Sequence, residues 1–220
     1  AAVVRSGRPA SRRPSVRGAE GDLESFIRAM DEVSRPMAEP LVRSLGRLAF
    51  RHLLDIGGAS GTWTAAFLRL HPKACATIFD RPDVIPMARR RMKAAGLLGR
   101  VRLVPGDYIR DALPTGADLA WVSAIVHQNS RAENRALFKK AFVALAPGGR
   151  ILIRDIVMDS SRTRPPGGAL FAVNMLVATP GGGTFTLGEL EEDLASAGFR
   201  RARLLRRGEG MDSVVCAVKP

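Results

Sequence analysis

The stretch LLDIGGASG, residues 53–61, decides how the rest of the chain is interpreted. In it an apolar run ends in the acid Asp55, and the turn that follows contains Gly57, Gly58 and Gly61. Glycine is needed where the backbone takes a positive φ, or where a ligand comes too close for a Cβ atom. A loop of this kind between a strand and a helix lies at the carboxyl edge of a sheet, where doubly wound folds bind ligands. The stretch predicts a site for a nucleotide-like cofactor, with a tight strand-to-helix turn as the alternative.

Short β-rich runs alternate with helical patterns on the C-terminal side of this loop. The alternation is typical of an α/β fold in which helices cover both faces of a mostly parallel sheet. The expected strands cover residues 52–56, 74–79, 101–105, 119–122 and 150–156, with 203–206 and 213–218 as a closing antiparallel pair. The expected helices cover residues 62–70, 84–95, 131–145 and 187–197, with an apolar helical segment at 170–178.

The beginning of the chain differs in composition from the rest. Residues 1–21 hold five arginines and a single acid, together with several Pro, Ser and Gly residues. Such a segment buries too little apolar surface to order itself. We therefore expect a flexible Arg-rich tail over residues 1–21 and one folded domain over residues 22–220.

A helical pattern follows the tail. Apolar residues recur at three- and four-residue steps between Phe26 and Met37, and Asp22 stands where an N-cap would be. Pro36 and Pro40 are expected to kink or break this helix, because proline removes a backbone hydrogen bond and its ring crowds the preceding turn.

The charge and cysteine content limit the possible partners and compartment. A formal net charge of +13 raises nucleic acid or an anionic membrane as a partner. The arginines, however, are spread along the whole chain without interleaved aromatics, and the apolar stretch 169–178 is shorter than the roughly 20 residues of a membrane span. The sequence thus favours neither partner. Cys75 and Cys216 lie far apart in apolar surroundings, which predicts buried thiols in a reducing compartment such as the cytoplasm.

Acidic residues stand at the ends of further predicted strands. Asp80 ends the second strand, where a carboxylate can accept hydrogen bonds from both hydroxyls of a ribose. Gly106, Asp107 and Tyr108 end the third, where a carboxylate and a ring can hold the amino group and face of adenine. These features favour an adenosine cofactor, with Asp55 facing the amino-acid half of a molecule like S-adenosylmethionine. A nicotinamide dinucleotide is a minor alternative, because neither register of DIGGASGTW gives the spacing G-x-G-x-x-G.

Six motifs in order carry a resemblance to a known family: LLDIGGASGTW, TIFDRPDVIPMAR, VPGDYIRD, VSAIVHQNS, LAPGGRILIRD and ATPGGGTFTLGELEEDLASAGF. Over about residues 22–220 the chain resembles the O-methyltransferases that include plant caffeate-type and bacterial polyketide-tailoring enzymes. The resemblance implies a Rossmann-like seven-stranded sheet with a reversed last strand, S-adenosylmethionine as cofactor, S-adenosylhomocysteine as product, and no metal. The cofactor residues we expect are Asp55, Gly57, Gly58, Gly61, Asp80, Arg81, Gly106, Asp107, Tyr108 and Ser123.

The resemblance also implies a catalytic histidine after the fourth strand, a place that His127 occupies in AIVHQNS. A hydroxyl that attacks the sulfonium methyl must lose its proton, and an imidazole, which titrates near neutral pH, is suited to accept it. Gln128 and Asn129 stand where plant relatives have Asp-Trp, and Thr184 stands where they have an assisting carboxylate. Asp155 matches another acidic position of the family and is expected either to orient His127 or to cap a loop.

An acceptor pocket is implied around the apolar segment 170–178, whose family counterpart lines it. Phe171, Asn174 and Met175 are the residues expected there, and Phe26 and Met30 are expected to close the pocket from above. Ordinary core packing is the alternative for these side chains.

The function expected from these observations is methyl transfer from S-adenosylmethionine to a hydroxyl of a small phenolic or natural-product molecule. An RNA-modifying methyltransferase and a cofactor-binding homologue without turnover are the alternatives. Relatives usually carry an N-terminal dimerisation domain that this sequence does not contain. A homodimer is therefore expected only where such a domain is supplied.

Overall fold

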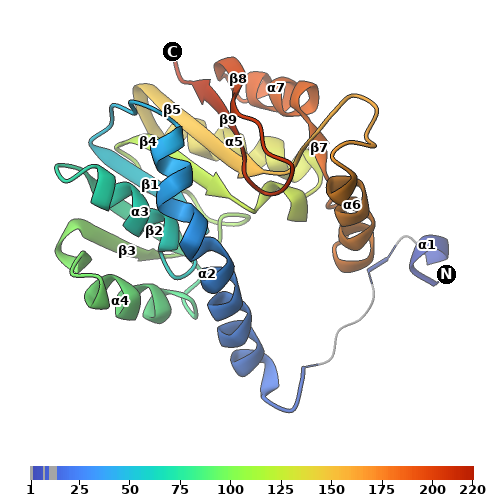
Figure 1. Cartoon of the computed structure of the whole chain (residues 1–220), viewed down its shortest axis with the longest axis horizontal. Coiled ribbons are helices and arrows are strands. Elements are labelled where there is room, and N and C mark those ends of the chain that lie inside the picture. Colours follow the sequence, from blue (N-terminus) through green and yellow to red (C-terminus); the bar gives the residue numbers. More distant parts are fainter. Residues whose placement is uncertain (1, 7, 10–13) are drawn as a thin grey trace.

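The chain is described by a computed structural model that covers residues 2–6, 8–9 and 14–220. Its centre is a seven-stranded sheet in the order β3-β2-β1-β4-β5-β9-β8 (Figure 1). Strands β1 to β5 run parallel and β9 runs antiparallel to β5, which confirms the predicted sheet with a reversed last strand. The strands of this sheet are β1 (His52–Ile56), β2 (Cys75–Asp80), β3 (Val101–Pro105), β4 (Ala117–Ser123), β5 (Leu145–Asp155), β8 (Arg200–Arg206) and β9 (Ser213–Val218).

Helices cover both faces of the sheet (Figure 1). One face packs against α2, α3 and α4, and the other packs against α5 and α7. The helices are α1 (Ala2–Ser6), α2 (Gly18–Ser44), α3 (Thr62–Leu70), α4 (Ile85–Ala94), α5 (Arg131–Ala144), α6 (Pro166–Ala178) and α7 (Leu187–Ser196), with 3₁₀ turns η1 (Leu98–Arg100) and η2 (Val126–Gln128). A separate parallel pair, β6 (Val157–Met158) with β7 (Phe185–Thr186), was not predicted from the sequence.

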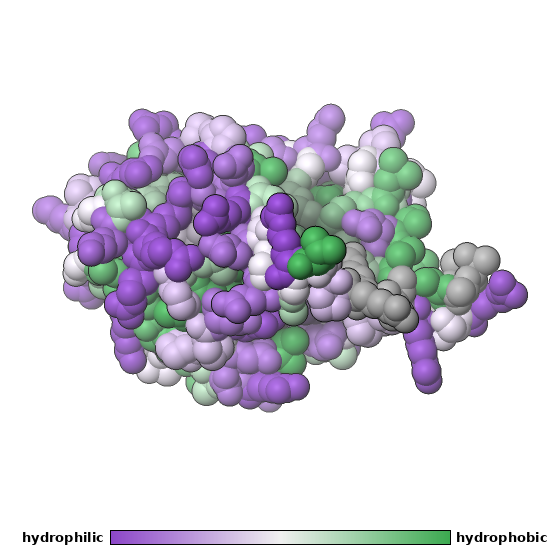
Figure 2. Space-filling model, turned by 90° about the horizontal axis from the view of Figure 1, so that it is seen from below, coloured by the Kyte–Doolittle hydropathy of each residue, from purple (hydrophilic) through white to green (hydrophobic). Residues whose placement is uncertain are grey.

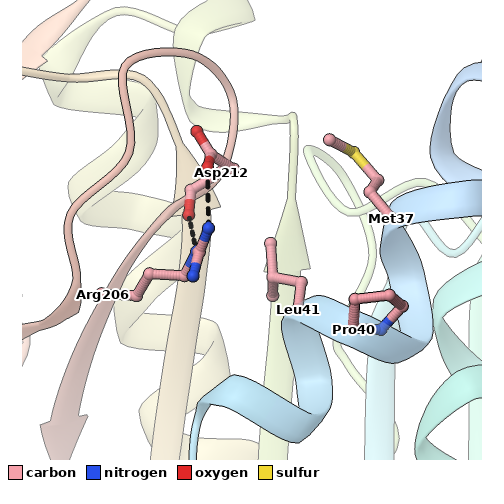
Figure 3. Close-up of a pocket in the computed structure, with 5 residues that line it drawn as sticks. All are labelled: Met37, Pro40, Leu41, Arg206 and Asp212. Atoms are coloured by element: carbon pink, nitrogen blue, oxygen red, sulfur yellow. Dashed lines mark hydrogen bonds and ion pairs between the residues drawn. The ribbon is translucent and has the colours of Figure 1, made fainter.

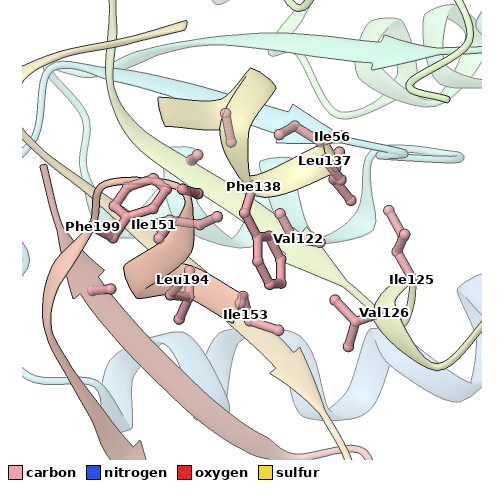
Figure 4. Packing of buried hydrophobic residues seen from close by; sticks show 14 of the residues in the cluster. Ile56, Val122, Ile125, Val126, Leu137, Phe138, Ile151, Ile153, Leu194 and Phe199 are labelled. Atoms are coloured by element: carbon pink, nitrogen blue, oxygen red, sulfur yellow. The ribbon is translucent and has the colours of Figure 1, made fainter. Parts of the chain in front are cut away.

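The two layers of core explain why the central strands are apolar without interruption. In β1 the side chains of Leu53 and Leu54 are both fully buried, yet they belong to the two different clusters on opposite faces. Successive side chains of a strand point to opposite faces, and a parallel sheet is covered on both. Phe138 of α5 and Leu194 of α7 fill the cluster on one side (Figure 4).

Helix α2 differs from its prediction in two respects. It begins at Gly18, so Asp22 lies inside the helix rather than at its N-cap. Pro36 and Pro40 also lie inside it and do not end it. An internal proline costs roughly 3 kcal/mol or more, but the segment around the two prolines buries Ala38, Leu41 and Val42 against the core shared with α3. Tertiary packing therefore outweighs the local preference.

The predicted tail is only partly covered by the structure. Residues 2–6 form α1, and residues 18–21 form the first turn of α2. Residues 1, 7 and 10–13 lie outside the described residues. The boundary between tail and domain stays a prediction.

The cysteine prediction was wrong for one of the two residues. Cys216 is buried in β9, but Cys75 is exposed, because it is the first residue of β2 at the amino edge of the sheet. Both thiols are free. Among the described helices, none combines the length and the hydropathy needed to cross a membrane.

Candidate active site

The glycine loop after β1 is shaped by the protein's own side chains. Gly57 and Gly61 have φ values of 66° and 82°, which favour glycine over any other residue. A Cβ atom on Gly57 would lie 2.5 Å from Cδ1 of Ile125, and one on Gly58 would lie 2.9 Å from Cγ of Asp55. The glycines therefore let the loop pack directly on the ends of β1 and β4.

Asp55 lies beneath this loop. It is only 1% exposed, and its Oδ2 accepts a hydrogen bond of 2.6 Å from the Thr64 hydroxyl in α3. Burial raises the pKa of the Asp55 carboxyl to about 7. This position supports the loop from inside the protein.

Asp80 connects the end of β2 to the glycine loop. Its Oδ2 accepts the backbone N–H of Ala59 at 2.7 Å, and its Oδ1 accepts the backbone N–H of Arg81 at 2.7 Å. Burial raises the pKa of this carboxyl above its ordinary value. Each carboxylate oxygen keeps a lone pair for a further donor. The Arg81 guanidinium is at the surface, where it pairs with Asp83 at 2.5 Å.

The end of β3 is close to Asp80. The Gly106 N–H donates to the Asp80 carbonyl oxygen at 2.9 Å, and a Cβ on Gly106 would lie 2.4 Å from the Phe79 ring. Asp107 is half-buried, and its Oδ1 accepts the N–H of Ile109 at 2.8 Å. Burial raises the pKa of Tyr108 to about 12, so its hydroxyl stays protonated. The ends of β1, β2 and β3 thus form one connected edge.

His127 and Asp155 form a buried pair beyond the end of β4. His127 lies in η2, and its Nδ1 is 2.9 Å from Oδ2 of Asp155, the last residue of β5. The two side chains are 8% and 1% exposed. Because a carboxylate only accepts, Nδ1 is the donor, and in the neutral imidazole Nε2 then carries the lone pair. Asp155 makes both of the contacts considered for it, because its Oδ1 also accepts the backbone N–H of Ile156 at 2.8 Å.

The glycine turn before β7 holds the backbone of His127. The Gly183 N–H donates to the His127 carbonyl oxygen at 2.9 Å. A Cβ on Gly182 would lie 2.3 Å from that same oxygen, so only glycine fits there. Thr184, which stands in place of the family carboxylate, donates its hydroxyl to the carbonyl oxygen of Gly168 at 3.4 Å instead.

A family model described as an O-methyltransferase domain matches residues 15–200 of the chain. The chain belongs to this O-methyltransferase family. Over 197 residues it is 33% identical to a 3-hydroxy-5-methyl-1-naphthoate 3-O-methyltransferase of Streptomyces sahachiroi, a match that covers 89% of the chain and 57% of that relative. The chain thus spans little more than half the length of this relative.

Solved structures of O-methyltransferases have the same fold. Human N-acetylserotonin methyltransferase, solved with S-adenosylmethionine, is 25% identical with a TM-score of 0.83, and the match covers 99% of this chain and 64% of the human chain. An O-methyltransferase family 2 protein of Planctomyces limnophilus, solved with apigenin, is 25% identical with a TM-score of 0.84, covering 94% and 63% of the two chains.

The residues predicted for the acceptor site of this O-methyltransferase domain are not all brought together. Phe171 packs edge-on against His127 with ring centroids 5.0 Å apart, and Met175 is buried beside it on α6. Asn174 is exposed. Phe26 and Met30 on α2 are 58% and 41% exposed, so they are neither core residues nor the roof of a closed pocket. Their role in acceptor binding stays a prediction.

One residue of the site was missed in the sequence. Asp31 of α2 is buried, accepts a hydrogen bond from the Thr62 hydroxyl at the start of α3, and pairs with Arg91 of α4 at 2.8 Å. It therefore ties two helices to the glycine loop of the O-methyltransferase domain. The available signal was the spacing of Asp31 four residues after Ile27, which places a carboxylate on the buried face of the helix.

Proposed function

We propose that the protein transfers the methyl group of S-adenosylmethionine to a hydroxyl of a small molecule, with His127 as general base. The observation that carries the proposal is the buried His127–Asp155 pair at the carboxyl ends of β4 and β5. Ile125, two residues before His127, packs against Gly57 of the glycine loop. Family membership and the cofactor complexes of structural relatives support the same reaction.

The residues at the sheet edge fit S-adenosylmethionine. Gly57, Gly58 and Gly61 let the loop pack closely on the strand ends next to the start of α3, and Asp80 keeps lone pairs for the ribose hydroxyls. Asp107 and Tyr108, with Gly106, would hold adenine. Arg81 and Ser123 stand at the same edge, and Asp55 acts through the loop that it supports.

The bound cofactor supplies an electrophilic methyl group on a sulfonium cation. With the cofactor and acceptor bound, His127 Nε2 would take the proton of the acceptor hydroxyl. Asp155 holds the imidazole so that Nδ1 carries its proton, and its negative charge stabilises the imidazolium that forms. Their burial excludes water from this proton transfer.

The proposed acceptor is a phenolic or natural-product molecule that binds next to α6. The naphthoate-methylating relative and the apigenin complex support this class of substrate. Phe171, Asn174 and Met175 would contact it, and Phe26 and Met30 would approach it from α2. We further propose a cytoplasmic location. We also propose that the protein forms a homodimer where a dimerisation domain is supplied.

The cofactor site is tested by isothermal titration of the purified chain with S-adenosylhomocysteine. We expect micromolar binding, and Asp80→Ala should weaken it because the ribose hydroxyls lose their acceptors. The matched control is Asp83→Ala, which removes an exposed carboxylate three residues after Asp80. A folded sample that does not bind S-adenosylhomocysteine would reject the proposal.

A further inference from the structure

Arg154 is a buried cation that the proposed mechanism does not use. It is the penultimate residue of β5, is 4% exposed, and lies on the face of the sheet that α2 and α3 cover. Its Nη1 donates to the Ser123 hydroxyl at 2.9 Å, and its Nη2 is 3.6 Å from the sulfur of Met37. Its guanidinium carbon lies 4.4 Å from the ring centroid of Trp63. All three partners are neutral.

The charge of Arg154 lacks a close counter-charge. Within the described residues, no carboxylate oxygen lies within 4.0 Å of its guanidinium nitrogens, and its buried Nε has no hydrogen-bond partner. Asp155 and Asp212 act on it only from a longer range, and burial lowers its pKa to about 10. A buried ion without a paired partner is strongly unfavourable. The half-buried Arg91 differs in this respect, since it pairs directly with Asp31.

The surroundings of Arg154 belong to the proposed cofactor edge. Ser123 ends β4, and Trp63 is the second residue of α3, directly after the glycine loop. Met37 separates Arg154 from a cavity of about 140 Å³ between α2 and the β8–β9 hairpin. In Figure 3, Met37 and Leu41 line this cavity opposite the Arg206–Asp212 pair. A flexible thioether is readily displaced, and displacement of Met37 would open the guanidinium to this cavity.

We propose that Arg154, together with the Ser123 hydroxyl, binds a carboxylate group of a ligand at the methyl-transfer site. A carboxylate supplies the missing charge and can accept from both Nε and a terminal nitrogen of the planar guanidinium. This inference rests on the proposed function. Two sources supply such a group: the amino-acid end of the cofactor, and a carboxylate on the acceptor.

The cofactor source is tested by comparing two titrants, S-adenosylhomocysteine and 5′-methylthioadenosine, which lacks the amino-acid end. Arg154→Met should raise the Kd of S-adenosylhomocysteine by about tenfold or more and change that of 5′-methylthioadenosine by less than about twofold. Arg150→Met removes the same charge four residues earlier in β5 and should leave both values unchanged. Arg154→Lys, which keeps a charge but not the fork, should give an intermediate loss.

The acceptor source is tested in a second arm, with 3-hydroxybenzoate and phenol titrated in the presence of saturating S-adenosylhomocysteine. Selective weakening of 3-hydroxybenzoate binding by Arg154→Met, with S-adenosylhomocysteine unaffected, would assign the carboxylate to the acceptor. If Arg154→Met changes the binding of neither carboxylate, the inference is overturned. A wild-type chain that fails to bind S-adenosylhomocysteine would instead reject the proposed function beneath it.

Protein stability gives an independent readout. Without ligand, Arg154→Met should melt at the same temperature as the wild type or higher, because methionine replaces an uncompensated buried charge with an apolar side chain. Added S-adenosylhomocysteine should then raise the melting temperature of the wild type more than that of the variant. A variant that is destabilised without ligand and shifted equally by it would show that Arg154 has only a structural role.

Discussion

His127 and Asp155 are the two residues on which the proposed chemistry depends. Nδ1 of His127 lies 3.0 and 2.9 Å from the two carboxylate oxygens of Asp155, which fixes the nitrogen that faces the carboxylate, and both residues are buried. Phe171 closes one side of the imidazole. The geometry leaves Nε2 as the only nitrogen of His127 able to accept a proton from an acceptor.

Replacing the base should separate catalysis from cofactor binding. His127→Ala should lower kcat by on the order of a hundredfold or more, the usual scale of general-base catalysis, while the Kd of S-adenosylhomocysteine changes little. His52→Ala is the matched control, because His52 lies at the amino end of β1 and contacts Thr77. Equal turnover in the two variants would contradict the assignment of the base.

Asp55 makes stability depend on pH. Its folded-state pKa of about 7 is above its ordinary value of 3.8, so the folded protein binds this proton more tightly than the unfolded chain. The unfolding free energy of the wild type should therefore fall as pH rises from about 4 to about 7. The Asp55→Asn variant has no carboxyl group to bind this proton. The difference between its unfolding free energy and that of the wild type should therefore increase with pH, by at most about 4 kcal/mol. Denaturant titrations at about pH 5 and about pH 8 measure this difference; a constant difference would contradict the prediction.

At the scale of elements, the glycine turn at residues 181–183 places the catalytic segment. It joins α6 to β7 and packs on the backbone at His127, while the Ser130 and Glu133 side chains form the capping box that begins α5 just after that segment. The position of the base is therefore set by the turn on one side and by a helix start on the other.

Two neighbouring glycines of the turn allow a matched test. Gly182→Ala would drive a methyl group into the His127 carbonyl oxygen and should lower kcat by tenfold or more, with S-adenosylhomocysteine affinity preserved. A Cβ on Gly183 meets nothing within 4 Å, so Gly183→Ala should retain kcat within about twofold. If both variants behave alike in steady-state assays, the turn does not position the base.

Helix α6 is an apolar helix that lies largely outside the hydrophobic core. Leu170, Val173 and Leu176 are 74%, 59% and 50% exposed, although the segment is apolar apart from Asn174. Figure 2 shows apolar side chains gathered on the right of the molecule, over α6. Its inner side contributes Phe171 and Met175 to the surroundings of His127.

At the scale of the whole molecule, the charge of +13 is distributed rather than concentrated. Many arginines pair with carboxylates on other elements, as Arg131 does with Asp193 at 2.8 Å. Cations that are paired or spread along the sequence release fewer counterions from a nucleic acid than a concentrated patch does, so we predict weak RNA binding.

Added salt should therefore change the ligand affinity of this protein only slightly. The Kd of S-adenosylhomocysteine, measured by calorimetry at low and at high salt, should change by less than about threefold, because its binding does not release a condensed counterion layer. RNA binding measured in parallel should be weak throughout. Tight RNA binding that falls steeply with salt would favour an RNA-modifying methyltransferase instead.

Local sequence determined much of the fold and of the chemistry. Strands β1, β3 and β9 and helix α3 have their predicted bounds, because apolar periodicity and turn residues are properties of neighbouring positions. The sequence also placed the glycine loop, Asp80 and His127 at strand ends. A parallel sheet brings such ends to one edge whatever the details of packing.

Tertiary structure decided which faces are buried and which charges lie together. The side chains of Phe26 and Met30 are exposed while Asp31 beside them is buried, because the orientation of α2 depends on α3 and α4. Pro36 remains inside a helix for the same reason. The burial of Arg154 requires Ser123, Met37 and Trp63 from three distant parts of the chain. Periodicity is local, whereas burial and charge pairing arise only when distant segments meet.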